Sequence, residues 1–134
     1  MTDATASDLA SAEAHFDRFV RAFSTFDATQ VADLFAAPGV ALRGDGSLAA
    51  LTTRDDVVRY CLAALDRYRR DGCRSCRWSR LSVLPMGRRG VLAAVTWDLL
   101  RDDGAALVRW RQSCCLSRSR GDGLKAFASA THAD

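Results

Sequence analysis

The stretch VLAAVTWDLLRDDGAALVRWRQ, residues 91–112, decides the fold of this chain. Apolar and polar residues alternate on both sides of the Asp103–Gly104 pair, and such a pair between alternating runs is the strongest short-range signal for a β-hairpin. With this pair as the loop, Trp97 lies opposite Trp110. One face of the hairpin is then apolar and the other carries paired charges, which predicts a half-buried antiparallel sheet.

The hairpin belongs to a predicted four-stranded meander that fills the second half of the chain. Its strands are expected at residues 73–85, 89–102, 105–118 and 123–132. Turn signals at Gly87–Arg88 and Gly121–Asp122 set the registers on either side of the hairpin. These registers put two rows of side chains on the inner face, an aromatic row of Trp78, Trp97 and Trp110 and a partly polar row of Arg80, Val95, Gln112 and Thr131.

The polar members of the second row suggest a ligand pocket. Buried polar groups cost about 1–3 kcal/mol each unless they have partners, and an apolar pocket with a few convergent polar groups is typical of a small-molecule site. The expected lining comprises Tyr60, Trp78, Arg80, Trp97, Trp110, Gln112 and Thr131. In the alternative interpretation, Arg80 reaches the sheet edge and Gln112 bonds to the backbone. Both interpretations stay open, because a shift of one residue in register would invert the faces.

Helical periodicity dominates the first half of the chain. Apolar residues recur at helical spacing from Leu9 to Phe26 and predict a long amphipathic helix. Asp27 is expected to cap a short second helix, which Pro38–Gly39 would end. Two short strands are expected at residues 40–43 and 47–52.

A third helix is predicted from Thr53 to Asp71–Gly72, because Thr53 and Asp56 form a capping-box pattern. Its inward residues are expected to be Val57, Val58, Cys61, Leu62, Leu65 and Tyr68. Tyr60 lies at the edge of this apolar face, where it could either donate a hydrogen bond into a cleft or border the core.

The composition is that of a globular protein without a strongly charged partner. The chain has 134 residues, 49% of them hydrophobic, and a net charge of +3, which predicts one domain over residues 1–134 with a frayed tail at 1–7. A basic cluster is formed by Arg67, Arg69, Arg70, Arg74 and Arg77. Asp66 and Asp71 are interleaved with these arginines, which favours a solvated face over nucleic-acid binding. No apolar run reaches the roughly 18 residues that cross a bilayer, and the first residues lack a signal-peptide pattern. We therefore expect a cytoplasmic protein that binds neither nucleic acid nor membrane.

The five cysteines are expected to be free thiols in a reducing compartment. Cys73 and Cys76 form one Cys-x-x-Cys pair, but a zinc site needs two more ligands. Cys114 and Cys115 do not supply them, because adjacent residues of a strand point to opposite faces. We expect no metal and no cofactor.

Two ionisable residues are candidates for acid/base catalysis. His15 lies beside Phe16 and Phe19 on the first helix, so its imidazole could enter a cleft; the alternative is a histidine on the helix surface. Asp98 could act as a base, but Arg109 lies opposite it across the hairpin. A paired, solvated carboxylate keeps a low pKa, so a surface ion pair is the alternative for Asp98.

The order of the elements, with helices first and the meander second, predicts an α+β fold. Three N-terminal helices are expected to pack on one face of a curved antiparallel sheet, which is made of the four-strand meander and the short strands. Such a sheet wraps the long helix and leaves a cleft at its open end.

Three segments resemble the SnoaL-like (nuclear transport factor two-like) superfamily: FDATQVADLF at 26–35, VTWDLLRDDG at 95–104 and AFASATH at 126–132. The resemblance covers nearly the whole chain and implies a cone-shaped α+β fold that dimerises through its outer sheet face. This fold hosts isomerases, dehydratases, epoxide hydrolases, cyclases and non-catalytic dimerisation modules, so the resemblance does not specify a reaction.

The ketosteroid isomerases of that superfamily carry a tyrosine and two acidic groups at positions that fall here on Phe19, Arg43 and Ser113 or Cys114. These departures remove the chemistry, so the resemblance argues against steroid isomerase activity. We expect a homodimer that binds a small, mostly apolar molecule, and any catalysis would be acid/base isomerisation, dehydration or cyclisation. The alternative is a non-catalytic dimerisation or scaffold module whose cone is filled by the three tryptophans.

Overall fold

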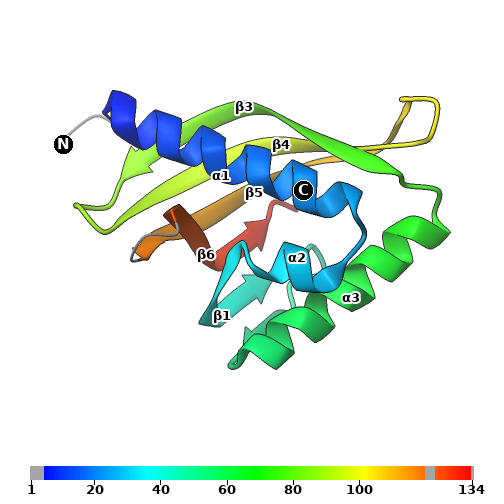
Figure 1. Cartoon of the computed structure of the whole chain (residues 1–134), viewed down its shortest axis with the longest axis horizontal. Coiled ribbons are helices and arrows are strands. Elements are labelled where there is room, and N and C mark those ends of the chain that lie inside the picture. The colour runs from blue at the N-terminus through cyan, green and yellow to red at the C-terminus, as the bar shows by residue number, and fades with distance from the viewer. Residues whose placement is uncertain (1–4, 120–122, 134) are drawn as a thin grey trace.

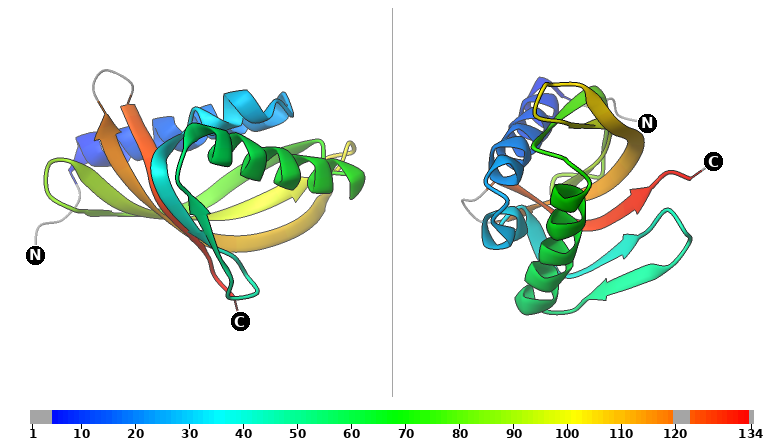
Figure 2. Two further views of the ribbon diagram at one scale, coloured as in Figure 1. Left: turned by 90° about the horizontal axis from the view of Figure 1, so that it is seen from below. Right: turned by 90° about the vertical axis from the view of Figure 1, so that its right-hand side faces the viewer.

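The computed structural model describes residues 5–119 and 123–133, within which the chain forms three helices and one six-stranded sheet (Figure 1). The helices are α1 (Ala6–Ser24), α2 (Ala28–Ala32) and α3 (Arg54–Arg70). The strands are β1 (Phe35–Leu42), β2 (Leu48–Leu51), β3 (Ser75–Pro85), β4 (Gly90–Leu100), β5 (Ala106–Ser119) and β6 (Gly123–Thr131). The sheet has the order β2-β1-β6-β5-β4-β3 and curves around α1 and α3 (Figure 2). This arrangement confirms the predicted α+β architecture.

Away from its turns, the meander pairs in the register that the sequence predicts, and near each turn the observed register is shifted by one residue. Trp97 of β4 lies opposite both Trp78 of β3 and Trp110 of β5. Gln112 of β5 lies opposite Thr131 of β6. The registers rest on the spacing of the turns, and the predicted turn residues Gly121–Asp122 themselves lie outside the described residues. Because these predicted partners are found opposite one another, the alternation of apolar and polar residues was sufficient to assign Trp78, Trp97, Trp110, Gln112 and Thr131 to the inner face.

The sheet is mixed, which corrects the expectation of a purely antiparallel one. β1 runs parallel to β6, with Ala41 opposite Ser129. A parallel pair needs a long connection, and here α3 and three strands of the meander separate the two partners in sequence. Pro38–Gly39, expected to end the second helix, lies inside β1, because α2 already ends at Ala32 with Asp33 as its C-cap.

A β-bulge in β3 moves Arg80 away from its predicted position. The register against β4 shifts between Ser79 and Ser82, so two residues of β3 face one residue of β4. Arg80 has a positive φ of 55°, and its side chain is exposed. The expected pairing of Arg80 with Val95 on the inner face is therefore wrong.

α1 and α3 each begin with a capping box. At α1 the Thr5 hydroxyl accepts from the backbone N–H of Asp8, and the Asp8 carboxylate accepts from the backbone N–H of Thr5. The predicted capping box opens α3 in the same way. α1 therefore starts at Ala6, inside the expected tail of residues 1–7, while residues 1–4 lie outside the described part.

The core fills the space between the concave face of the sheet and the helices. Its largest fully buried side chains are Phe16, Leu99, Leu116, Leu124, Val57, Val91, Val95 and Cys73. On α3, Cys61 and Leu65 are buried, whereas Leu62 is 48% exposed and does not face inward as predicted. No described helix combines the length and apolar character needed to cross a membrane.

Candidate functional site

A cavity of about 600 Å³ opens between α3 and the concave face of the sheet. Its apolar walls come from α1 to α3 and from β1, β3, β4 and β5, through Phe19, Phe23, Val31, Phe35, Cys61, Ala63, Ala64, Leu65, Cys76, Trp97, Leu99, Val108 and Trp110. Its polar lining comprises Arg43, Asp45, Tyr60, Arg67, Tyr68, Gln112, Ser129 and Thr131. A concave, mostly apolar space with a few polar groups is the usual form of a small-molecule site.

Aromatic rings form the inner wall. The Trp97 ring centroid lies 5.1 Å from that of Phe19, and the Trp110 ring centroid lies 6.4 Å from that of Tyr68. Trp97 is buried, whereas Trp110 is half-buried at the edge of the opening. These contacts between α1, α3 and the sheet fix the wall, because packed aromatic pairs favour such tilted or offset arrangements.

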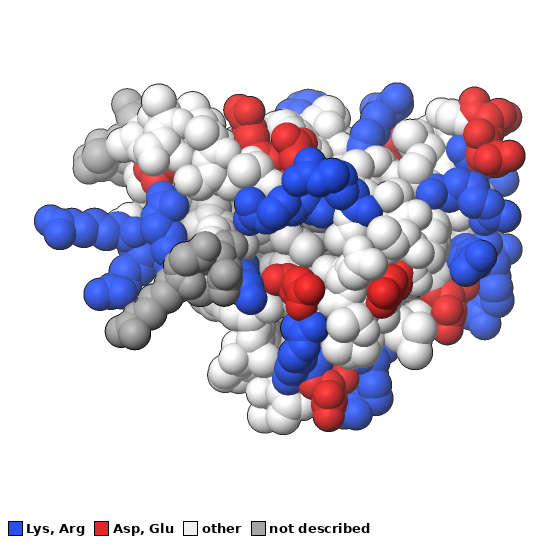
Figure 3. Space-filling view, viewed as in Figure 1, with Lys and Arg blue, Asp and Glu red and all other residues white. Residues whose placement is uncertain are grey.

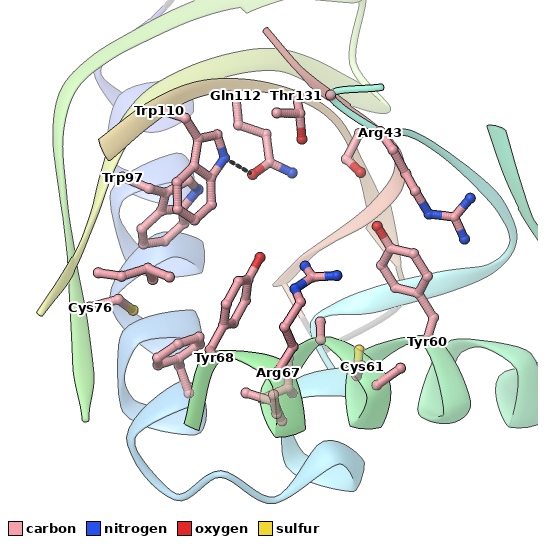
Figure 4. Close-up of a pocket in the computed structure, with 18 of the residues that line it drawn as sticks. Arg43, Tyr60, Cys61, Arg67, Tyr68, Cys76, Trp97, Trp110, Gln112 and Thr131 are labelled. Atoms are coloured by element: carbon pink, nitrogen blue, oxygen red, sulfur yellow. Dashed lines mark hydrogen bonds between the residues drawn. The ribbon is translucent and has the colours of Figure 1, made fainter. Parts of the chain in front are cut away.

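A hydrogen bond orients Gln112. The indole Nε1–H of Trp110 donates to Gln112 Oε1 at 3.2 Å. An indole nitrogen can only donate, so the atom that it meets must be the amide oxygen. The amide nitrogen of Gln112 is therefore the atom that points into the cavity (Figure 4).

Three residues of α3 face the cavity because they lie on one side of the helix. Tyr60 and Arg67 are seven residues apart, close to two helical turns, and Tyr68 follows directly. Figure 4 shows their hydroxyl and guanidinium groups directed at the sheet. Burial raises the pKa of the Tyr60 phenol above its ordinary value, so this hydroxyl stays protonated and can donate.

The β1–β2 turn supplies the outer rim of the cavity. The Arg43 guanidinium lies 5.7 Å from the centre of the Tyr60 ring, and its Nη1 donates to the Ser47 hydroxyl at 3.1 Å. Asp45 Oδ1 accepts from the hydroxyl and the backbone N–H of Ser47, at 2.6 and 2.9 Å. The hydrogen bonds from Ser47, and to a lesser extent the charge of Arg43, lower the pKa of Asp45.

The structure brings five of the seven predicted pocket residues to this cavity. Tyr60, Trp97, Trp110, Gln112 and Thr131 line it. Their hydroxyl, indole and amide groups come from α3, β4, β5 and β6. The sequence pattern predicts that the side chains from the three strands share the inner face of the sheet. The shared face follows from the alternation along each strand.

Trp78 and Arg80 are not among the lining residues. Trp78 lies on the predicted face but under α1, where its Nε1–H donates to Asp17 Oδ1 at 2.9 Å and its ring lies 6.3 Å from that of Phe16. Arg80 is turned to the surface by the bulge, and its carbonyl accepts from Arg111 Nη1 at 2.9 Å. Trp78 is therefore kept out of the cavity by α1, and Arg80 is kept out of it by the bulge. These two residues are the β3 members of the two predicted rows.

The candidate acid/base residue His15 lies in the core and not in the cavity lining. It is 2% exposed, and its Nδ1 lies 3.0 Å from the carbonyl oxygen of Leu124. A carbonyl only accepts, so Nδ1 carries the proton. Burial lowers the pKa of His15 from 6.5 to about 4, which keeps the ring neutral at physiological pH.

The second candidate, Asp98, lies on the opposite face of β4 from Trp97. Arg109 Nε donates to its Oδ1 at 2.7 Å, and Arg77 Nε donates to its Oδ2 at 3.2 Å. The hydrogen bond from Arg109 is the main cause that lowers the pKa of Asp98, with Arg77 adding to it. The predicted ion pair is present, although the carboxylate is buried beneath the two guanidinium groups.

Five further residues line the cavity that the sequence pattern did not predict there: Arg43, Asp45, Arg67, Tyr68 and Ser129. Tyr68 was expected in the core and Arg67 in a solvated basic cluster. The spacing of Tyr60 and Arg67 along α3 was a usable signal, because it places both on one face. Arg43 and Asp45 could not be found in this way, since a turn has no periodicity.

The thiols of the site are unreactive in this setting. Burial raises the pKa of the Cys61 thiol to about 11 and also raises the pKa of Cys76, so both stay protonated. Within the described residues, no three His, Cys, Asp or Glu side chains are placed to hold a metal ion. Over the face shown in Figure 3, basic and acidic side chains are interspersed.

Comparisons with known proteins identify a matching protein family and solved structures of similar fold. A family model described as NTF2-like protein (DUF6841) matches residues 7–134, and no curated protein matches the chain. Aln2 from a Streptomyces species has a similar structure, with a TM-score of 0.78, 18% identity and coverage of 98% of this chain and 94% of that chain.

Two further solved structures share the fold. A protein from Catenulispora acidiphila in complex with S-DNPA has a TM-score of 0.74 and 20% identity, over 95% of each chain. A candidate calcium/calmodulin dependent protein kinase II association domain from Xanthomonas campestris has a TM-score of 0.68 and 20% identity, over 98% of this chain and 95% of that chain. At such identities the similarity shows the fold alone.

Proposed function

The chain belongs to the NTF2-like family DUF6841, in agreement with the resemblance to the SnoaL-like superfamily, and we propose that it binds a small, largely apolar molecule in the cavity between α3 and the sheet. The observation that carries this proposal is the cavity itself, about 600 Å³ in volume, with aromatic walls and polar atoms from Tyr60, Tyr68 and Gln112. Pockets for small molecules generally span about 300–1,000 Å³ and have this composition. The complex of the Catenulispora protein with S-DNPA supports it by analogy of fold.

Any catalysis in this cavity would act on a ligand oxygen that gains negative charge. Gln112, Tyr60 and Tyr68 offer hydrogen-bond donors there, and donors aimed at a developing oxyanion stabilise a transition state. This suits the isomerisations, dehydrations and cyclisations that proceed through enolates. The lining carboxylate, Asp45, has a lowered pKa and sits at the rim, so the geometry favours binding and oxyanion stabilisation over proton abstraction by the protein.

A ligand screen with a filled-cavity variant tests the binding proposal. Ala64 lines the cavity from α3, so Ala64→Trp should fill part of it and abolish binding. Leu62→Trp is the matched control, because Leu62 is on the same helix but exposed. The panel comprises bicyclic and tricyclic aromatic compounds, both neutral and acidic, scored by thermal shift and by calorimetry. A compound at 100 times its Kd should raise the free energy of unfolding by about 2.7 kcal/mol.

A panel without a single stabilising compound would contradict the proposal. So would a compound that binds Ala64→Trp as tightly as it binds the unmodified chain, because it would then occupy another place.

We also propose that two copies associate through the outer face of the sheet. Small and apolar side chains form a stripe there across four strands, at Leu84, Leu92, Ala94, Cys115 and Ala128, and these positions lie on neighbouring paired strands. Leu84 is 42% exposed and the others are half-buried. An association domain is among the structures of similar fold, which supports the alternative of a dimerisation module.

Sedimentation or light scattering tests the association. Leu92→Glu, in the centre of the stripe, should convert a dimer to a monomer. Leu48→Glu should not, although Leu48 on β2 is 67% exposed, because it lies outside the stripe. A monomeric unmodified chain would contradict the proposal.

We place the protein in the cytoplasm as a further proposal. All five cysteines lie in the described residues and all are free. Free, mostly buried thiols are usual in a reducing compartment.

A further inference from the structure

The polar end of the cavity is rich in hydrogen-bond donors. The Gln112 amide nitrogen can only donate, and the Gln112 amide oxygen accepts from the Trp110 indole. The Arg67 and Arg43 guanidinium groups can also only donate. The tyrosine, serine and threonine hydroxyls can do either. Among the described side chains of the lining, only the carboxylate of Asp45 is restricted to accepting, and its Oδ1 is engaged by Ser47.

Arg67 is the cation best placed for a ligand. Its guanidinium carbon lies 5.1 Å from the centre of the Tyr68 ring, and Figure 4 shows the group directed into the same space as the Gln112 amide nitrogen. Among the residues that the structure describes, no carboxylate lies within ion-pair distance of it. Arg43 differs, because it shares its turn with Asp45, whose negative charge offsets it.

From this arrangement we infer that the ligand is an aromatic carboxylate, with its ring system against the aromatic wall and its carboxylate on Arg67 and the Gln112 amide. A guanidinium group binds a carboxylate through charge-assisted hydrogen bonds, which are roughly twice as strong as neutral ones. A neutral amide of the same shape can accept from these donors only through weaker hydrogen bonds to its uncharged carbonyl oxygen. The inference rests on the proposed function, to which it adds the chemical class of the ligand.

A matched pair of probes separates charge from shape. 2-Naphthylacetic acid and 2-naphthylacetamide have nearly the same size, but only the acid is an anion at pH 7. We expect the acid to bind at least about tenfold more tightly, which is the effect of a hydrogen bond to a charged group. Calorimetry gives both Kd values, and quenching of the lining tryptophans gives an independent measure.

Two variants assign the preference to Arg67. Arg67→Gln should weaken binding of the acid far more than binding of the amide and so remove the preference for the acid. Circular dichroism and the Tm of the variant show that it folds. Arg70→Gln is the matched control, since Arg70 is in the same last turn of α3 but is not among the lining residues. It should keep the full preference.

Gln112→Glu provides a second, independent variant. The glutamate can still accept the Trp110 indole proton but places a negative oxygen where the amide nitrogen was. The acid should then bind more weakly than the amide.

Equal affinities of the unmodified chain for acid and amide would overturn the inference and leave the binding proposal standing. A preference that survives Arg67→Gln, or that Arg70→Gln removes equally, would also overturn it. If neither probe binds and the broader panel contains no ligand, both the inference and the proposed function fail.

Discussion

At the scale of single residues, His15 shows how burial, as the largest cause, sets the protonation state of a side chain. The unfolded chain binds a proton at His15 with a pKa near 6.5, and the folded chain only near pH 4. Between these values the unfolded state holds more protons, so stability rises with pH in this window. The contribution of neutral His15 to the free energy of unfolding is essentially complete at pH 7, and it is lost as the pH falls through 6.5 toward 4.

We predict that His15→Gln removes this pH dependence. From pH 7 to pH 4 the unmodified chain should lose about 3 kcal/mol more stability than the variant, since one pKa unit corresponds to about 1.36 kcal/mol. Urea unfolding at half-unit steps of pH measures the difference. Parallel curves for the two proteins would mean that His15 is not buried in its neutral form.

A variant of Asp98 can show that the two faces of the sheet have different roles, one in stability and the other in ligand binding. Asp98→Asn removes the charge that Arg109 and Arg77 share and places an amide NH₂ against a guanidinium group. It should lower the free energy of unfolding by about 1.5–3 kcal/mol at pH 7, the range for hydrogen bonds to charged groups. The loss should shrink below the ordinary aspartate pKa of 3.8, because the lowered pKa stabilises the fold only above it.

Ligand binding should be unaffected in Asp98→Asn, since the cavity lies on the other face of β4. A change in Kd comparable to that in Arg67→Gln would contradict this separation of the faces.

At the scale of elements, alternation and turn spacing were sufficient to predict four strands and their registers away from the turns, but not the shift of one residue near each turn. They could not predict the bulge in β3, because nothing in the residues around Arg80 marks a positive φ: the position holds neither glycine nor asparagine. They assigned Trp97, Trp110, Gln112 and Thr131 to one face. They could not show that α1 covers Trp78, because alternation along a strand shows which side chains are buried but not which helix packs on them.

Gly39 tests the close approach of β1 and β6. A Cβ at this position would lie 2.9 Å from the carbonyl oxygen of Phe127 and 3.0 Å from that of Ala36. Both are backbone atoms, so the strands themselves would have to move. We predict that Gly39→Ala costs about 1–3 kcal/mol.

The control for this prediction is Gly44→Ala. The nearest atom to its added methyl would be the Thr131 methyl carbon at 3.6 Å, an ordinary contact. Thermal unfolding of both variants gives the comparison, and equal changes in Tm would contradict the close approach of the two strands.

At the scale of the whole molecule, β6 is the strand that joins the two halves of the chain. It pairs with β5 on one edge and with β1 on the other. The sequence could not predict this pairing of β1 with β6, because turn signals and alternation relate only strands that are neighbours in the chain. The cavity depends on it, since Arg43 and Thr131 reach one rim only when β1 lies beside β6.

We predict that Ala128→Pro abolishes cooperative unfolding of the whole chain, because proline removes a ladder hydrogen bond and is excluded from central strands. Leu48→Pro should be much milder, since Leu48 is the first residue of the edge strand β2. Circular dichroism during heating distinguishes the two. A cooperative transition in Ala128→Pro near that of the unmodified chain would show that the halves fold independently.

The parallel pairing of β1 with β6 also bears on the time course of synthesis. Residues 35–42 leave the ribosome long before residues 126–130, to which they must pair, and such distant pairings give a high contact order and slow folding. Until then β1 and β2 form a ribbon whose β1 edge lacks its final partner β6, and this edge is a site for premature association with other nascent chains. Chaperone capture should therefore be greatest after α3 has emerged and should end once β6 is free.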